Sequence, residues 1–216
     1  MFNQGMKTRN VYHVIILDES GSMIPKKEGV VGGFKSYVSE IKSSNSSSNH
    51  FMSLITFNDS SKVPLNKVSL TDVDKYNIDN SYRPSGMTAL FDAIGLGIST
   101  HKHLDSDNST FIFNIFTDGE ENVSRECSQS QIQEMISGLR STNRWVFNYM
   151  GVEEDAISTA TAMGINARNV MRYEDNSMGT LKSMSYVARA AANYSVALDK
   201  GAALSTADFM ELGKED

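Results

Sequence analysis

Continuous runs of apolar residues recur along the chain and predict buried β-strands. The first run covers residues 11–17 and reads VYHVIIL, which is rich in β-branched residues. Such a run is typical of a parallel strand that is covered on both faces. Further strands are predicted at 51–57, 62–68, 110–116, 145–150 and 169–172. Because only a short link precedes 62–68, we expect a hairpin there and an antiparallel edge strand.

Segments with apolar residues at helical spacing lie between these strands. Helices are predicted at about 25–43, 88–101, 129–139, 155–163 and 179–198. Strands that alternate with helices predict an α/β fold with a doubly wound, mostly parallel sheet, one antiparallel edge strand and helices on both faces. We expect residues 1–10 to form an N-terminal tail, 11–198 one domain, and 199–216 an extension that is either a short helix or disordered.

Composition narrows the possible functions. The net charge is −6, and a general nucleic-acid-binding protein would show a basic excess instead. Cys127 is the one cysteine, so the chain forms no internal disulfide and no cysteine-based zinc site. The first ten residues lack the apolar core of a signal peptide, and no apolar run reaches the ~20 residues that span a bilayer. We therefore expect a cytoplasmic protein that binds neither nucleic acid nor membrane.

Three loops that follow or precede these elements carry oxygen ligands. The loop after the first strand reads DESGS and offers Asp18, Ser20 and Ser22. Thr88 opens a predicted helix, and Asp118 follows the strand at 110–116. In a doubly wound sheet, ligands bind at the carboxyl ends of the strands, near the point where strand order reverses. Carboxylate and hydroxyl oxygens suit a small hard cation such as Mg²⁺.

The ordered set of these residues resembles a known family. The spacing Asp18-x-Ser20-x-Ser22, followed by Thr88 and by Asp118 with its glycine, is similar to the metal-ion-dependent adhesion site of von Willebrand factor A domains. The resemblance covers about residues 11–150, and all five positions hold the expected residue types. The chain looks most like small, stand-alone intracellular A domains of bacteria and their phages.

The resemblance implies a role for each residue. Ser20, Ser22 and Thr88 would coordinate the metal through their hydroxyls, while Asp18 and Asp118 would bind it largely through water. The metal would be Mg²⁺, with Mn²⁺ or another divalent cation as alternatives. An open coordination position would accept an Asp or Glu side chain of a protein partner. A-type domains in bacteria also resemble adaptors for AAA+ ATPases or multiprotein complexes, so such a partner is expected as a separate protein.

Other interpretations of the same residues remain open. Each loop taken alone also fits a turn or a helix cap. An aspartate after the first strand also resembles the nucleophile of Mg²⁺-dependent phosphohydrolases of the haloacid dehalogenase type. Those enzymes need a second Asp two positions later, where this chain has Ser20, and a hydroxyl does not readily serve as acid and base. We therefore expect a binding protein and no enzyme.

Several charged and titratable residues are predicted to be structural or solvated. Lys26 and Lys27 follow the first loop, where we expect a solvated surface that could steer an acidic partner. His13 lies in a predicted buried strand and is expected to be a hydrogen-bonded core residue. His101 and His103 are predicted to lie at a solvated helix end, because side chains two positions apart do not share a helical face.

Overall fold

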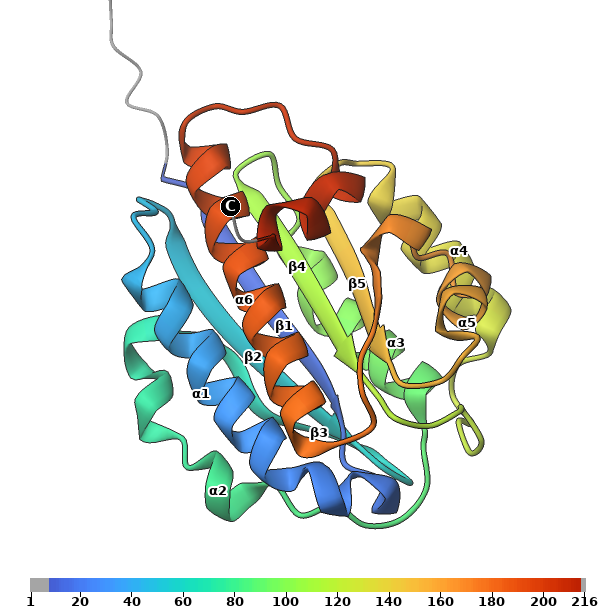
Figure 1. Ribbon diagram of the computed structural model, residues 1–216. Coiled ribbons are helices and arrows are strands. Elements are labelled where there is room, and N and C mark those ends of the chain that lie inside the picture. The colour runs from blue at the N-terminus through green and yellow to red at the C-terminus, as the bar shows by residue number, and fades with distance from the viewer. Residues whose placement is uncertain (1–7, 215–216) are drawn as a thin grey trace, which may run out of the picture.

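A six-stranded sheet lies between two layers of helices in the computed structural model, which describes residues 8–214 (Figure 1). Within residues 8–214 the strand order is β3-β2-β1-β4-β5-β6, and only the β2–β3 pair is antiparallel. The strands are β1 (Asn10–Asp18), β2 (Asn49–Phe57), β3 (Ser61–Ser69), β4 (Ser109–Phe116), β5 (Trp145–Gly151) and β6 (Val170–Arg172). The predicted fold class, with its antiparallel edge strand, is confirmed.

The helices follow the predicted alternation with the strands. The α-helices are α1 (Lys27–Ser43), α2 (Ile78–Ser81), α3 (Leu90–His101), α4 (Gln129–Arg140), α5 (Ala156–Ala162) and α6 (Ser177–Asp199). Short 3-10 helices are η1 (Gly21–Lys26), η2 (Leu70–Lys75), η3 (Lys102–Leu104), η4 (Ala167–Asn169) and η5 (Thr206–Gly213). In Figure 1, α1 and α6 lie side by side over one face of the sheet, and α3 lies behind the other face.

Side chains that alternate along β1 build two separate cores. Ile15 and Leu17 pack into the core under α1 and α6, whereas Val14 and Ile16 pack into the core under α3 and α4. Successive side chains of a strand point to opposite faces, so a strand covered on both faces is apolar at nearly every position. This explains why the VYHVIIL run contains no polar alternation.

Helix α1 begins later than the pattern predicts. The predicted helix started near Pro25, but residues Gly21–Lys26 form the 3-10 helix η1 and the α-helix begins at Lys27. Proline fits near a helix start because its missing N–H is not needed there. The segments η2 and α2, which connect β3 to the loop before α3, were not predicted from the sequence.

The C-terminal segment packs onto the domain. Helix η5 contacts α6, with Phe209 fully buried and its ring centroid 5.5 Å from that of Tyr194. Of the predicted tail 1–10, residues 1–7 lie outside the described residues, as do 215–216 of the extension. In Figure 1, η5 lies at the end of the sheet opposite the loop that follows β1.

Within residues 8–214, no helix has both the length and the apolar character needed to cross a membrane.

Candidate metal centre

Asp18 ends β1 and is completely buried at the carboxyl edge of the sheet. Its Oδ1 accepts a hydrogen bond from the Ser20 backbone N–H at 2.7 Å, and its Oδ2 accepts one from the Thr117 hydroxyl at 2.7 Å. The Tyr82 hydroxyl donates to the Asp18 backbone carbonyl at 2.5 Å. These contacts hold the carboxylate in one orientation, between the ends of the neighbouring strands β1 and β4.

A chain of polar contacts joins Ser20, Ser22 and Asp118. The Ser22 hydroxyl donates to Asp118 Oδ1 at 2.6 Å, and the hydroxyls of Ser20 and Ser22 lie 3.0 Å apart. A serine hydroxyl has one proton, so Ser20 must donate to Ser22. Ser20 is buried and Ser22 is exposed, which leaves this cluster open to solvent on the Ser22 side. The structure thus brings together three predicted site residues from two loops.

Thr88 reaches the same cluster from the loop before α3. A methyl group added at Gly119 would lie 3.6 Å from the Thr88 hydroxyl and 4.0 Å from the Ser22 hydroxyl. Both hydroxyls therefore border the same small space beside the Gly119 backbone. Asn122 holds the Thr88 backbone through two hydrogen bonds. The Asn122 side-chain Oδ1 accepts from the Thr88 backbone N–H at 3.0 Å, and the Asn122 backbone N–H donates to the Thr88 carbonyl at 3.1 Å.

The helix-cap alternatives find no support in these loops. Ser20 occupies the N-cap position of η1, but its side chain makes no capping hydrogen bond. At α3 the N-cap position belongs to Ala89, one residue after Thr88. The hydroxyls of Ser20 and Thr88 are thus free of the capping role that each motif alone would suggest.

The donor set fits a hard divalent cation by its chemistry. The five predicted residues supply three hydroxyls and two carboxylates, all of them oxygen donors of the kind that Mg²⁺ and Mn²⁺ prefer. The small space beside Gly119 is bordered by two of these donors, the hydroxyls of Thr88 and Ser22. Within residues 8–214, no cluster of three or more His, Cys, Asp or Glu side chains is placed to hold a metal. Any metal at this edge would therefore depend on the hydroxyls as well as the carboxylates.

Burial sets the electrostatics of Asp18. Loss of water raises the pKa of Asp18 to about 6, and the hydrogen bonds from Ser20 and Thr117 offset part of this effect. A nearby cation favours the charged form of a buried carboxyl group. Burial also raises the pKa of Tyr82 and Tyr173, whose hydroxyls therefore stay protonated and can donate to the loop carbonyls.

The prediction that Lys26 is solvated is wrong. Its side chain is 4% exposed, and its ammonium forms an ion pair with Asp118 Oδ2 and lies 2.5 Å from Asp175 Oδ1. Burial lowers the pKa of Lys26, but the two carboxylates outweigh this and raise the pKa above its usual value. The sequence carries no signal for this contact, because Asp118 and Asp175 lie 92 and 149 positions further along the chain.

Sequence reasoning also missed the residues that hold the loops. Thr117 bonds Asp18, and Tyr173 donates to the Thr117 carbonyl at 3.0 Å. Asp92 accepts hydrogen bonds from three successive backbone N–H groups, at positions 125–127. Glu121 accepts from the backbone N–H of Phe91 at 3.0 Å, so it is bonded to α3. Only Thr117 had a usable signal, its place directly before Asp118.

The histidines divide between a confirmed and a wrong prediction. His13 is a buried, bonded core residue as predicted, with Nδ1 3.0 Å from the Tyr37 hydroxyl and Nε2 2.9 Å from Nδ1 of His50. His101 was predicted at a solvated end but is fully buried, with the Ser53 hydroxyl 2.8 Å from its Nε2. The contact to β2 across the sheet face explains the difference, because the helix end is covered by tertiary packing.

The largest exposed apolar side chains gather at the same edge of the sheet. Within residues 8–214 these are Ile24, Met87, Ile157 and Met178. Ile24 lies in η1, Met87 directly precedes Thr88, and the other two lie in the first turns of α5 and α6. Ile24, Ile157 and Met178 lie in segments that follow the carboxyl ends of parallel strands, and Met87 lies in the loop before α3, so all four belong to segments at the edge that carries the predicted metal residues.

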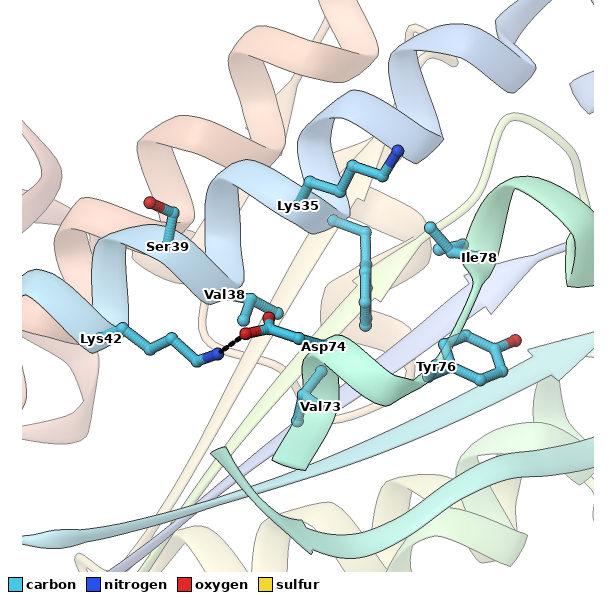
Figure 2. Close-up of a pocket in the computed structure, with 9 residues that line it drawn as sticks. Lys35, Val38, Ser39, Lys42, Val73, Asp74, Tyr76 and Ile78 are labelled. Carbon is cyan, nitrogen blue, oxygen red and sulfur yellow. Dashed lines mark hydrogen bonds and ion pairs between the residues drawn. The ribbon is translucent and has the colours of Figure 1, made fainter. Parts of the chain in front are cut away.

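A pocket of about 400 Å³ lies elsewhere, along α1 (Figure 2). It is lined on one side by α1 and on the other by the segment from Val73 to Ile78. Lys42, at one end of the pocket, pairs with Asp74 at 2.6 Å. None of the five predicted site residues lines this pocket, so it is separate from the metal centre.

Comparison with known proteins supports the fold through structure alone. No family model matches the sequence, and no curated protein matches it either. Among solved structures, a von Willebrand factor type A protein from Catenulispora acidiphila is 14% identical with a TM-score of 0.62, over 86% of this chain and 43% of that one. The SpRpn10 VWA domain is 11% identical with a TM-score of 0.61, over 81% of this chain and 93% of that one.

A third similar structure concerns the metal. Proximal thread matrix protein 1 from the mussel byssus, in a structure described as having a zinc-occupied MIDAS motif, is 16% identical with a TM-score of 0.62. The match covers 86% of this chain and 46% of that one, so this chain spans less than half of that structure and of the Catenulispora structure. At these identities the likeness shows the fold: the chain has the fold of a von Willebrand factor A domain.

Proposed function

We propose that this protein is a binding module that engages an acidic side chain of a protein partner through a divalent metal ion. The observation that carries the proposal is the cluster of Ser20, Ser22 and Asp118 beside Asp18, at the carboxyl ends of β1 and β4. The hydroxyls supply neutral ligands, so a bound cation keeps most of its charge and can attract a partner's carboxylate. Mg²⁺ is the proposed ion, with Mn²⁺ as its close substitute.

The surroundings of the cluster support a protein as the partner. The exposed apolar side chains at this edge, Ile24, Met87 and Met178 among them, offer apolar area that a bound protein partner would remove from water. A partner residue with a carboxylate, flanked by apolar side chains, fits both features. We further propose that the protein acts in a cytoplasmic complex, in which an AAA+ ATPase is one candidate partner.

Binding is a better account than phosphoryl transfer. A nucleophilic Asp18 would need an exposed oxygen, but this carboxylate is fully buried, with one oxygen bonded to the Ser20 N–H and the other to the Thr117 hydroxyl. The second acid of that reaction would be Ser20, whose hydroxyl donates to Ser22. These contacts support the proposal that the protein is no enzyme of that type.

Selection of displayed peptides tests the proposal directly. Random peptides would be captured on the protein in Mn²⁺ and eluted with a chelator, beside the Ser22→Ala variant and Ser99→Ala as a matched control. Ser99 is exposed on α3, and its hydroxyl donates to the Leu96 carbonyl of its own helix. We expect enriched peptides to share an Asp or Glu that cannot become Asn or Gln, and to be lost with Ser22→Ala alone. Peptides without an acidic residue, or retained in chelator, would refute the proposal.

A further inference from the structure

The ammonium of Lys26 is placed inside the candidate metal centre. It pairs with Asp118 Oδ2, lies 2.5 Å from Asp175 Oδ1 and donates to the Ser22 carbonyl at 3.2 Å. An ammonium has three donors, so these three acceptors use all of them. The side chain of Asp118 is fully buried and that of Lys26 is 4% exposed, so this is a buried ion pair and not a surface contact.

The ion pair uses a carboxylate that the metal centre also needs. Asp118 Oδ1 accepts from the Ser22 hydroxyl, while its Oδ2 contacts Lys26. Asp18, Asp118 and Asp175 together carry a charge of −3, which the Lys26 ammonium, paired with Asp118 and Asp175, reduces to −2. A divalent cation beside the serine hydroxyls would therefore meet one positive charge a few ångströms away, in a partly buried site where screening by salt is weak.

We propose that Lys26 is a tethered cation that competes with the divalent metal for Asp118 and so sets the metal affinity of the site. This inference rests on the proposed function, since it concerns the same metal centre. In the metal-free protein, the positive charge of Lys26 offsets part of the repulsion between the carboxylates of Asp18 and Asp118. In the metal-bound protein, its charge opposes that of the ion, so the site binds metal more weakly than its five ligands alone would.

Asp175 provides a second partner for the displaced ammonium. Its side chain is 65% exposed and it precedes the N-cap residue of α6, Asn176. When a metal takes over Asp118, Lys26 can keep its contact with Asp175 and move toward solvent with it. The displaced ammonium then keeps a carboxylate partner. A buried charge without a partner would cost much free energy, and this displacement leaves none.

Replacing Lys26 with methionine tests the proposal because it keeps the apolar stem and removes the charge. Lys26→Met would be compared with the wild type and with Lys27→Met, its less buried neighbour, by calorimetric titration of MgCl₂ and MnCl₂ into chelator-treated protein. Melting temperatures would be measured without and with metal. We expect Lys26→Met to melt lower than the wild type without metal, yet to bind metal at least about tenfold more tightly. Lys27→Met should change neither quantity appreciably.

The two readouts separate competition from a structural role. A residue that only holds the loops would lower the melting temperature and leave or weaken the metal affinity, so an equal or lower affinity in Lys26→Met overturns this inference while the proposed function stands. Failure of both proteins to bind metal overturns the proposed function and this inference with it. If Lys26→Met does not fold, Lys26→Gln would replace it, because glutamine keeps a hydrogen-bond donor for Asp118 without the charge. A higher metal affinity in Lys26→Gln than in the wild type would support the inference, and an equal or lower affinity would overturn it.

Discussion

The hydroxyl of Ser22 lies 2.6 Å from Asp118 Oδ1, although 96 positions separate the two residues along the chain. The contact joins the loop after β1 to the loop after β4, because these two strands are neighbours in the sheet. Parallel neighbours bring their carboxyl ends to one edge, which is where ligands of such sheets bind. The Ser22–Asp118 pair is therefore the most direct structural sign that the separated motifs form one centre.

Removal of the Ser22 hydroxyl should weaken metal binding with little loss of fold. Ser22→Ala keeps the charge of the site, whereas Asp118→Ala would strip the buried Lys26 ammonium of a partner and destabilise the protein for that reason alone. We expect the rise in melting temperature on adding Mg²⁺ or Mn²⁺ to require about tenfold more metal in Ser22→Ala. An unchanged metal response in this variant would exclude Ser22 as a ligand.

Gly86 should be required for the loop that carries Thr88. Its φ is +76°, and an added methyl would lie 2.0 Å from Asp59 Oδ2, while its carbonyl accepts from the Gly21 N–H at 3.0 Å. Because a side chain in this backbone region is strained, we expect Gly86→Ala to cost about 1–2 kcal/mol in urea unfolding. The metal response should weaken as well.

The control for Gly86 is a glycine with the opposite expectation. Gly138 lies within α4 and a methyl there would contact nothing within 4 Å, so Gly138→Ala should stabilise the protein by about 0.5–1 kcal/mol. If both substitutions changed stability in the same direction, the positive φ of Gly86 would not be the reason for its effect.

Burial of His101 should make the protein sensitive to acid. Its Nδ1 lies 2.8 Å from the Gly97 carbonyl and its Nε2 2.8 Å from the Ser53 hydroxyl, so the neutral ring is bonded at both nitrogens. Burial lowers the pKa of His101 from 6.5 to about 4. The unfolded chain then binds more protons than the folded one between these values, so stability rises with pH across this window. The contribution of the buried neutral His101 to stability is fully present above pH 6.5 and is lost as the pH drops toward 4.

The variant His101→Gln isolates this contribution. Urea unfolding would be measured for both proteins at several pH values between about 6.5 and 4. The free energy of unfolding of the wild type should fall by about 3 kcal/mol on acidification, and that of the variant should lack this loss. His13 and His50, whose pKa values are also lowered chiefly by burial, add a slope of the same sign to both proteins. Parallel pH profiles for the wild type and His101→Gln would contradict the assignment.

Phe209 should anchor the C-terminal segment to α6. Its side chain is fully buried, and the Tyr186 hydroxyl donates to the carbonyl of the next residue, Met210, at 2.7 Å. Loss of a buried aromatic ring costs about 3–5 kcal/mol, so we expect Phe209→Ala to lower the free energy of unfolding by that amount. Glu211→Ala, which removes an exposed carboxylate in the same segment, should leave the free energy of unfolding nearly unchanged. Equal stability of both variants would show that Phe209 does not anchor the segment.

Much of the candidate site could be predicted because four of its five residues, Asp18, Ser20, Ser22 and Asp118, lie at or just after the ends of recognisable strands. Asp18 follows one mainly apolar run of seven residues, and Asp118 follows shortly after another. If both runs are parallel strands of one sheet, their carboxyl ends and these two aspartates lie at the same edge. His101 and Lys26 could not be placed in the same way. Each was judged from its neighbours in the chain, whereas its burial comes from Ser53 on β2 and from the loop after β4.

The sequence by itself determined the alternation of the main strands and helices, the two-sided burial of β1 and the candidate ligands at its end, since these depend on periods and spacings within short segments. Only the tertiary structure decided that Asn122 holds Thr88, that Tyr173 holds Thr117, and that Lys26 shares Asp118 with the candidate metal centre. These contacts join residues up to 92 positions apart, and they exist only because the folded sheet aligns the ends of its parallel strands.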